Sequence, residues 1–286
     1  MSNERESRTA QEIFTASYNL PDPRRYYSLL APLGYRQPEV VANFLHASGA
    51  VIRHARGHDR LHVLDFGSGY GALGAMLRHR FSIRELFEHY ENTRAESAQA
   101  GETIQGDRSF FSQHRCHDSS FELGGLDIAG QALRYALTCG LIDAAFEENL
   151  LLGEPSAELA AFVAQTDLIV ETGAVYDVVV ACYEKLLAGV GTRPPWLLFG
   201  PRGDADTEPL RRMLHRRGYR IESIGTGRHR YRQFMNPAER QAAEERMRAL
   251  GRRPADHIQA GWFVNPLLLA RPEADAQSLS VESFIT

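Results

Sequence analysis

The amino-acid sequence predicts an α/β protein built on a doubly wound, mostly parallel β-sheet. The first observation is a short apolar run, 61–66, which leads into a glycine-rich turn and then into a helix-like segment whose apolar residues share one face, Ala72, Leu73, Met76 and Leu77. The second observation is that strand-like and helix-like runs alternate along the rest of the chain. Because parallel strands need a crossover connection, usually a helix, this alternation indicates a sheet covered on both faces.

Six further runs complete the expected set of strands. They are short and largely apolar, and they cover residues 123–127, 144–150, 167–171, 196–200, 219–224 and 261–269. The clearest of the intervening helices has apolar residues at helical spacing from Val175 to Leu187. Ser156 and Thr207 are suitable N-terminal caps for two others.

Three regions are interpreted as additions to this sheet domain, which covers residues 60–272. Residues 1–59 are expected to form an N-terminal helical cap, with an apolar stripe at Val40, Val41, Phe44 and Leu45. A polar, charge-rich stretch over about 81–121 is expected to be an insertion after the first strand. Residues 273–286 are expected to form a C-terminal tail.

Composition and charge narrow the class of partner. A hydrophobic fraction of 43% and a charged fraction of 24% are typical of soluble globular proteins. The net charge of -4 argues against nucleic acid or an anionic membrane as the main partner, because both select basic surfaces. Three cysteines, a polar N-terminus and the lack of a run of ~20 apolar residues predict a cytoplasmic protein without a membrane span. A small-molecule substrate is therefore expected, whereas the oligomeric state and any protein partner stay open.

Candidate chemistry is concentrated in the turn after the first expected strand, Asp65-Phe66-Gly67-Ser68-Gly69-Tyr70-Gly71. Its glycines let the backbone turn sharply and come close to a ligand. Doubly wound sheets bind ligands at the carboxyl ends of their strands, so a nucleotide-like cofactor is the expected occupant. The spacing Gly69-x-Gly71-x-x-Gly74 also satisfies the dinucleotide fingerprint, whose helix amides bind a pyrophosphate.

Two carboxylates favour a cationic nucleoside over a dinucleotide. Asp65 lies two positions before the first glycine, where it would repel a pyrophosphate and attract an ammonium or sulfonium group. Asp127, at the end of the second expected strand, can accept hydrogen bonds from both hydroxyls of a ribose. It lies beyond the offset of ~20 residues that dinucleotide-binding units show, and the insertion accounts for the difference.

The run from Val63 to Gly71 resembles the first motif of class I S-adenosylmethionine-dependent methyltransferases, and residues 125–129 resemble their second motif. The arrangement is similar to bacterial members of natural-product pathways. The resemblance implies a Rossmann-like sheet of seven strands with an antiparallel final hairpin, for which 219–224 and 261–269 are the candidates. It also implies that S-adenosylmethionine is the cofactor and that the chain transfers a methyl group to a small metabolite, with an anionic acceptor as one option.

The resemblance further implies which residues bind the cofactor. Asp65 would anchor the amino group of the methionine moiety, the glycines would line that moiety, and Asp127 would hold the ribose. The full expected set is Asp65, Gly67, Ser68, Gly69, Tyr70, Gly71, Asp127, Ile128, Asn149, Leu150 and Glu171.

Acceptor-side residues depend on the acceptor itself. A hydroxyl acceptor benefits from a nearby base, for which the candidates are His229, Glu171 and Tyr176, whereas an amine or thiol needs none. Guanidinium groups bind anions bidentately, so the basic run between the last two strands is either an anion site or a solvated turn. The expected acceptor-binding residues are Arg24, Tyr27, Arg202, Arg228, Arg230 and Tyr231.

No metal site is expected. One cluster could suggest a metal but lacks a second ligand pair at structural-zinc spacing, and it is interpreted as a solvated loop: His114, Cys116, His117 and Asp118. His54 and His58 are four residues apart, but Gly57 weakens the helix that would align them.

Three other functions remain open from the residues alone. One is a methyltransferase-fold enzyme with altered chemistry, such as an intramolecular displacement that closes a small ring, for example an aziridine. Another is a non-catalytic protein that binds the cofactor and acts on a partner. An NAD-dependent oxidoreductase ranks last, because Asp65 disfavours a diphosphate.

Overall fold

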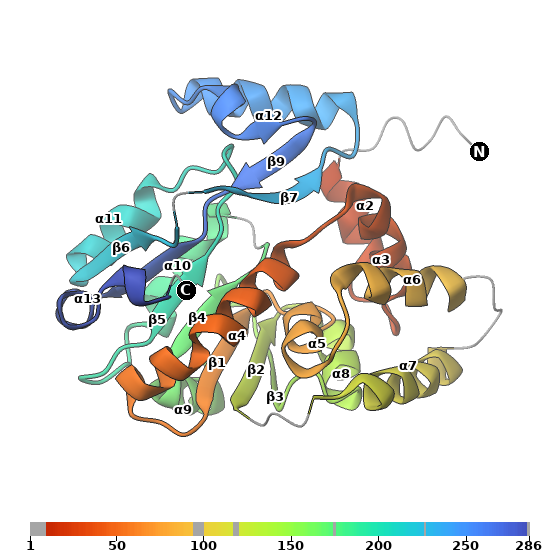
Figure 1. The fold of residues 1–286 in the computed structure, drawn as a ribbon, viewed down its shortest axis with the longest axis horizontal. Helices are drawn as coiled ribbons and strands as arrows, with labels where there is room; N and C mark the ends of the chain where they lie inside the picture. The colour runs from red at the N-terminus through yellow and green to blue at the C-terminus, as the bar shows by residue number, and fades with distance from the viewer. Residues whose placement is uncertain (1–9, 94–99, 117–119, 174–175, 226, 285–286) are drawn as a thin grey trace.

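The computed structural model describes residues 10–93, 100–116, 120–173, 176–225 and 227–284 (Figure 1). Within these residues, seven strands form one sheet in the order β3-β2-β1-β4-β5-β10-β6. Neighbouring strands from β3 to β5 are parallel, and β10 runs antiparallel to both β5 and β6. The expected mostly parallel, doubly wound sheet is therefore confirmed. The strands are β1 (Leu61–Phe66), β2 (Phe121–Asp127), β3 (Ala144–Glu147), β4 (Leu168–Glu171), β5 (Trp196–Phe199), β6 (Tyr219–Ser223) and β10 (Leu268–Pro272).

Side chains alternate along each strand between the two faces of this sheet, and both faces are apolar. Helices therefore cover both faces, and each side has its own apolar core. On β1, Val63 packs into one core and Leu64 into the other. The first core is shared with α4 (Gln37–Arg56), α5 (Ala72–Arg78) and α8 (Gly130–Thr138). The second is shared with α9 (Ala157–Gln165), α10 (Tyr176–Leu186) and α11 (Glu208–Arg216).

The N-terminal region is helical, as expected, and it packs against the segment 81–121. It contains α2 (Ala10–Ser17), α3 (Arg24–Leu30) and the 3-10 helix η1 (Ala31–Leu33), which precede α4. The later segment contains α6 (Ile83–Thr93) and α7 (Ala100–His114). Helices α3 and α6 are in contact, and the ring of Tyr27 stacks on that of Tyr90 with their centroids 4.6 Å apart. Figure 1 shows α2, α3 and α6 gathered on one side of the molecule.

The expectation of a single strand over 261–269 is wrong. Residues Trp262–Asn265 form β9 of a second sheet, whereas the seventh strand of the main sheet, β10, begins at Leu268. Pro266 separates the two strands, since it has no amide hydrogen to donate to a ladder. The apolar run continues on both sides of the proline, so the hydrophobic pattern alone does not reveal the break.

The second sheet belongs to a segment inserted between β6 and β10. Its described strands pair antiparallel in the order β7 (His229–Gln233), β9 and β8 (Ile258–Gln259). Helix α12 (Pro237–Ala249) and the 3-10 helix η2 (Pro254–Asp256) lie between β7 and β8 in the chain. In Figure 1 this small sheet and α12 lie at the top of the view, above the main sheet.

The C-terminal segment packs on the body of the domain. It contains α13 (Glu273–Ser278) and the 3-10 helix η3 (Val281–Phe284). The ring of Phe284 contacts Trp196 of β5 at a centroid distance of 5.9 Å, and η3 contacts α4. The residues after β10 thereby fasten the long helix α4 to the sheet.

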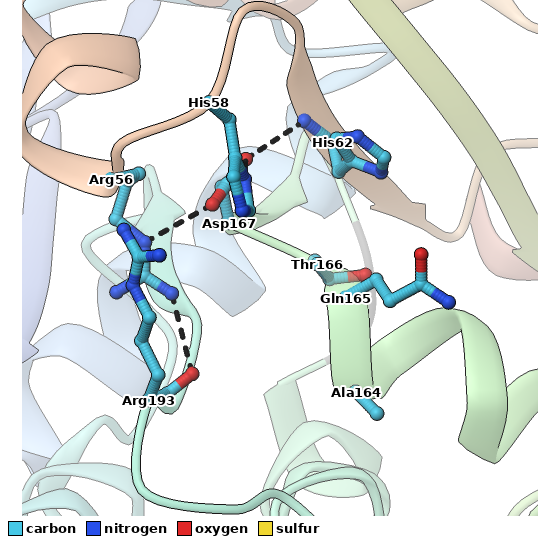
Figure 2. A pocket seen from close by; sticks show the side chains of 8 residues that line it. All are labelled: Arg56, His58, His62, Ala164, Gln165, Thr166, Asp167 and Arg193. Atoms are coloured by element: carbon cyan, nitrogen blue, oxygen red, sulfur yellow. Dashed lines mark hydrogen bonds and ion pairs between the residues drawn. The ribbon is translucent and has the colours of Figure 1, made fainter.

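A pocket of about 230 Å³ lies at the amino ends of β1 and β4, and its charged groups neutralise one another (Figure 2). Asp167 has no exposed surface, and its carboxylate meets Arg56 Nε at 3.2 Å and His58 Nδ1 at 2.9 Å. The backbone N–H of His62 donates to the same carboxylate at 3.1 Å. This ion-pair network joins the end of α4 to the residue before β4. Removing one partner would destabilise the protein, because it would leave a buried charge uncompensated.

The packing of α5 on the sheet makes a stability prediction. A Cβ on Gly74 would lie 2.0 Å from the backbone oxygen of Leu141, so Gly74→Ala should lower the free energy of unfolding by ~2–3 kcal/mol. The matched control is Gly106→Ala in α7, where a Cβ meets nothing within 4 Å and alanine should add ~0.5–1 kcal/mol. Urea denaturation of both variants measures the difference. Equal stabilities would contradict the close approach of α5 to Leu141.

Candidate functional site

The turn after β1 has a backbone shape that requires glycine. Gly67, Gly69 and Gly71 have φ values of 76°, 51° and 75°, in the left-handed region that other residues rarely adopt. The N–H groups of Gly67 and Ser68 donate to the carbonyl of Leu126 at 2.8 and 3.3 Å. The turn is therefore fastened to the carboxyl end of β2, and it lies beside the point where the strand order reverses between β1 and β4.

Three buried carboxylates meet at the carboxyl ends of three neighbouring strands. Asp65 on β1, Asp127 on β2 and Glu171 on β4 are 2%, 8% and 1% exposed. Burial raises the pKa of Asp65 to about 7, and the negative charges of Asp127 and Glu171 add to the shift. The neighbouring Ser68 hydroxyl acts in the opposite direction on this pKa, but within the described part of the chain neither Asp65 Oδ1 nor Ser68 Oγ has a hydrogen-bond partner of good geometry. The edge is thus acidic and contains polar atoms suited to a ligand.

Asp127 is held by three donors. Its Oδ2 accepts the N–H of Gly69 at 2.8 Å and the hydroxyl of Tyr18 at 2.7 Å, and its Oδ1 accepts the N–H of Ala129 at 2.9 Å. These bonds fix the carboxylate next to the glycine turn. The two motifs, which lie far apart in the sequence, are therefore brought together by a direct hydrogen bond between Gly69 and Asp127.

Tyrosines of the N-terminal region lie over this acidic edge. The ring of Tyr18 makes edge contacts with Tyr26 and Tyr70 at centroid distances of 5.4 and 6.0 Å. The hydroxyl of Tyr70 accepts the N–H of Leu20 at 2.7 Å, and burial raises the pKa of Tyr70 to about 12. Aromatic faces above buried carboxylates are a suitable environment for an organic cation.

His229 and Tyr231 project from β7 toward the ends of β5 and β4. His229 Nε2 lies 2.7 Å from Gln37 Oε1, and burial lowers the pKa of this histidine to about 4, so the ring is neutral at physiological pH. Because an amide oxygen only accepts, Nε2 carries the proton and the lone pair lies on Nδ1. Tyr231 lies two residues after His229 on β7 and so shares its face of the strand. A Cβ added to Gly173 would lie 3.0 Å from the Tyr231 hydroxyl.

Asn265 completes this second half of the site. It is the cross-strand partner of His229, it is fully buried, and its Nδ2 donates to the carbonyl of Gly200 at 2.9 Å. Sequence reasoning missed Gln37 and Asn265, which lie 228 positions apart and carry no motif. Only the folded contact between α4, β7 and β9 identifies them.

The arginines expected to bind an anion are not gathered at one point. Arg202 forms a bidentate pair with Asp204 and stacks over the ring of Phe263 at 4.9 Å. Arg230 lies over Trp262 at 5.2 Å, and Arg228 contacts His257 at 2.9 Å. Because side chains alternate along β7, Arg230 lies on the opposite face from His229 and Tyr231, whereas Arg228 precedes the strand.

The remaining predicted site residues have varied surroundings. Tyr27 is buried and stacks on Tyr90 of α6, whereas Arg24 forms a local ion pair with Asp22 at 2.9 Å. Leu150 is buried, and Asn149 Oδ1 accepts the N–H of Leu151 at 3.0 Å. The side chain of Tyr176 lies outside the described residues.

An exposed apolar rim borders the acidic edge at the ends of β2 and β3. Ile128, which follows Asp127, is 64% exposed, and Leu151 and Leu152 are exposed beyond β3. The sequence singled out Ile128 but not the two leucines.

Two kinds of feature are not found in the described ranges, a cluster of metal ligands and a membrane-spanning helix. Those ranges contain no group of three or more histidine, cysteine, aspartate or glutamate residues placed to hold a metal. His117 and Asp118 lie outside them, so the sequence interpretation of that cluster stays a prediction. Within the same ranges no helix is long and apolar enough to cross a bilayer.

Comparisons with known proteins give weak similarities. No protein-family model matches the chain, and no curated protein matches it. Among solved structures, YcgJ of Bacillus subtilis is similar at a TM-score of 0.42 and 12% identity, covering 79% of this chain and 98% of YcgJ. The magnesium protoporphyrin IX methyltransferase of Synechocystis PCC 6803, crystallised with S-adenosylmethionine, is similar at 0.35 and 12% identity, covering 81% of this chain and 80% of that enzyme.

A third structure, EvdMO1, is similar at a TM-score of 0.41 and 12% identity over 84% of this chain. The chain spans 42% of the length of EvdMO1. At such TM-scores these similarities carry no inference about activity. The sheet order β3-β2-β1-β4-β5-β10-β6, with the antiparallel strand β10, is that of a Rossmann-like methyltransferase fold.

The raised pKa of Asp65 predicts a pH effect on stability. An acid with a pKa of about 7 when folded and ~3.9 when unfolded keeps its proton in the folded state, so stability falls as pH rises from about 4 through 7. Asp65→Asn removes this loss and should gain ~2–4 kcal/mol on the wild type between pH 5 and pH 8. Urea denaturation at both pH values measures it. Equal changes of the unfolding free energy with pH in the wild type and the variant would show that folding does not raise the pKa of Asp65.

Proposed function

We propose that the chain binds S-adenosylmethionine at the acidic edge of β1, β2 and β4 and transfers its methyl group to a small molecule. The observation that carries this proposal is the set of three buried carboxylates, Asp65, Asp127 and Glu171. Among the described residues, no cationic side chain forms an ion pair with Asp65 or Asp127. Such a field attracts an ammonium or sulfonium group and repels a diphosphate. It therefore supports the cationic cofactor over NAD.

The residues present fit each part of this cofactor. The unpartnered Oδ1 of Asp65 is suited to the amino group, and Asp127 is suited to the ribose hydroxyls. The left-handed glycine turn leaves room for the methionine moiety, and the apolar rim at Ile128 is suited to a flat base. Asn149 and Leu150 stay predicted contacts of that base.

Bound S-adenosylmethionine supplies a methyl group that its positive sulfur already activates. The chain then has to orient an acceptor and exclude water. The N-terminal tyrosines cover the edge, and His229 Nδ1 is a neutral base that can take the proton of an acceptor hydroxyl. Glu171 and Tyr176 remain the other predicted bases.

The charges around His229 support an acceptor without a negative charge at its reacting end. Arg202 is already paired with Asp204, Arg230 lies on the other face of β7 over Trp262, and Arg228 contacts His257. An anionic acceptor from a natural-product pathway, which the sequence favours as one option, would have to displace Asp204. We therefore place the acceptor group between His229 and Tyr231 in this proposal.

Calorimetric titration tests the cofactor. S-adenosylmethionine and its demethylated product should bind at least about tenfold more tightly than NAD, a difference of ~1.4 kcal/mol, because the acidic edge opposes a diphosphate. Tight binding of NAD with no response to S-adenosylmethionine would overturn the proposal. Product masses then separate methyl transfer, which adds one methyl group, from ring closure, which does not.

Asp127→Ala tests the ribose contact. Loss of a charge-assisted hydrogen bond, worth ~1.5–3 kcal/mol, should weaken binding of S-adenosylhomocysteine tenfold or more. The matched control is Glu147→Ala, since Glu147 is the register neighbour of Asp127 on β3 but is exposed and pairs with Arg134. That variant should stay within about twofold of the wild type. Equal losses of affinity in both variants would mean that the overall negative charge of this edge, and not Asp127 itself, holds the ligand.

A further inference from the structure

A short segment of the chain, Tyr18–Leu20, crosses the glycine turn and contacts the residues proposed to bind the cofactor. It joins α2 to the turn that precedes α3. At its start, Tyr18 donates its hydroxyl to Asp127 Oδ2 at 2.7 Å. At its end, the N–H of Leu20 donates to the hydroxyl of Tyr70 at 2.7 Å. We call this segment the strap.

Tyr18 lies directly on the open face of the turn. A Cβ on Gly69 would be 2.4 Å from the Tyr18 hydroxyl, so only the lack of a side chain at Gly69 allows the approach. Desolvation and the charge of Asp127 raise the pKa of Tyr18 well above its usual value, and the hydroxyl keeps its proton as a donor. Asp127 Oδ2 is therefore saturated by the Tyr18 hydroxyl and the N–H of Gly69.

Two hydrogen bonds from Gln131 hold the middle of the strap. Its backbone N–H donates to Asn19 Oδ1 at 2.8 Å, and its Nε2 donates to the Asn19 carbonyl at 3.1 Å. Asn19 has a φ of 58°, a left-handed conformation that asparagine tolerates better than most residues. Hydrogen bonds therefore hold the strap at each of its three residues, Tyr18, Asn19 and Leu20.

We propose that Tyr18 is an internal competitor for the cofactor site, whose hydroxyl occupies on Asp127 the place of a ribose hydroxyl and is displaced when the cofactor binds. This inference rests on the proposed function, because Asp127 is the residue assigned to the ribose. Displacement exchanges one hydroxyl donor for another on the same oxygen, so the carboxylate keeps a partner in both states. The affinity for the cofactor is then set partly by how often the strap is released.

Calorimetry with S-adenosylhomocysteine tests the strap without using activity. Tyr18→Phe keeps the ring and removes the competing hydroxyl, so the dissociation constant should fall about tenfold. Gln131→Ala removes one fastening of the strap and leaves Tyr18 intact, and it should act in the same direction, by about threefold. Tyr90→Phe is the matched control, since that buried hydroxyl contacts Tyr135 and not Asp127, and it should leave the affinity unchanged.

A double-mutant cycle assigns the effect to Asp127. In the Asp127→Ala background, Tyr18→Phe should bring no gain, because the bond that it releases is already gone. Amide exchange gives a second readout: adding S-adenosylhomocysteine should speed exchange of the Leu20 N–H, which the strap otherwise protects, while a purely structural segment would become slower or stay unchanged.

The outcomes separate the strap from the cofactor assignment. Binding by the wild type with equal or weaker binding by Tyr18→Phe overturns the strap and leaves the cofactor assignment standing. A gain that persists in the Asp127→Ala background also overturns it, because the release would not act through that carboxylate. Absence of binding in the wild type and in both strap variants overturns the proposed function and the strap together, whereas binding by Tyr18→Phe alone supports both.

Discussion

The negative charge gathered at one edge of the sheet is the constraint on which the rest of the structure depends. Three parallel strands end in buried carboxylates, and burial together with the charges of Asp127 and Glu171 raises the pKa of Asp65. A fold tolerates buried carboxylates of like charge only where hydrogen bonds or an opposite charge offset the cost of removing them from water. Here the neighbouring groups are backbone N–H donors and a tyrosine hydroxyl, which satisfy hydrogen bonds without neutralising the charge.

The opposite edge of the same strands shows how a structural carboxylate is treated. Asp167 lies immediately before β4, whereas Asp65 lies near the end of β1, and both are buried. Asp167, however, pairs with Arg56 and His58, so its charge is compensated inside the protein. The same chain thus supplies cations to Asp167 and, among the described residues, no ion pair to Asp65. This contrast favours a ligand, and not packing, as the reason for the acidic edge.

Local patterns were enough to predict the sheet and the meeting of the two sequence motifs. Alternating runs gave the parallel strands, and Asp65, the glycine turn and Asp127 are brought together as the motif spacing implies. The seventh strand was misplaced because the apolar run continues across Pro266. Gln37, His229 and Asn265 meet only through contacts between segments far apart in the chain, and no period or spacing encodes such a meeting.

The strap follows from the same electrostatic constraint. An arginine or lysine in place of Tyr18 would neutralise Asp127 more strongly, but it would also cancel the field that selects a cationic ligand. A tyrosine hydroxyl satisfies the carboxylate while leaving its charge intact. Because its pKa is raised, it remains a neutral donor over the physiological range. The chain can therefore hold the acidic edge closed before a ligand arrives without making that edge less acidic.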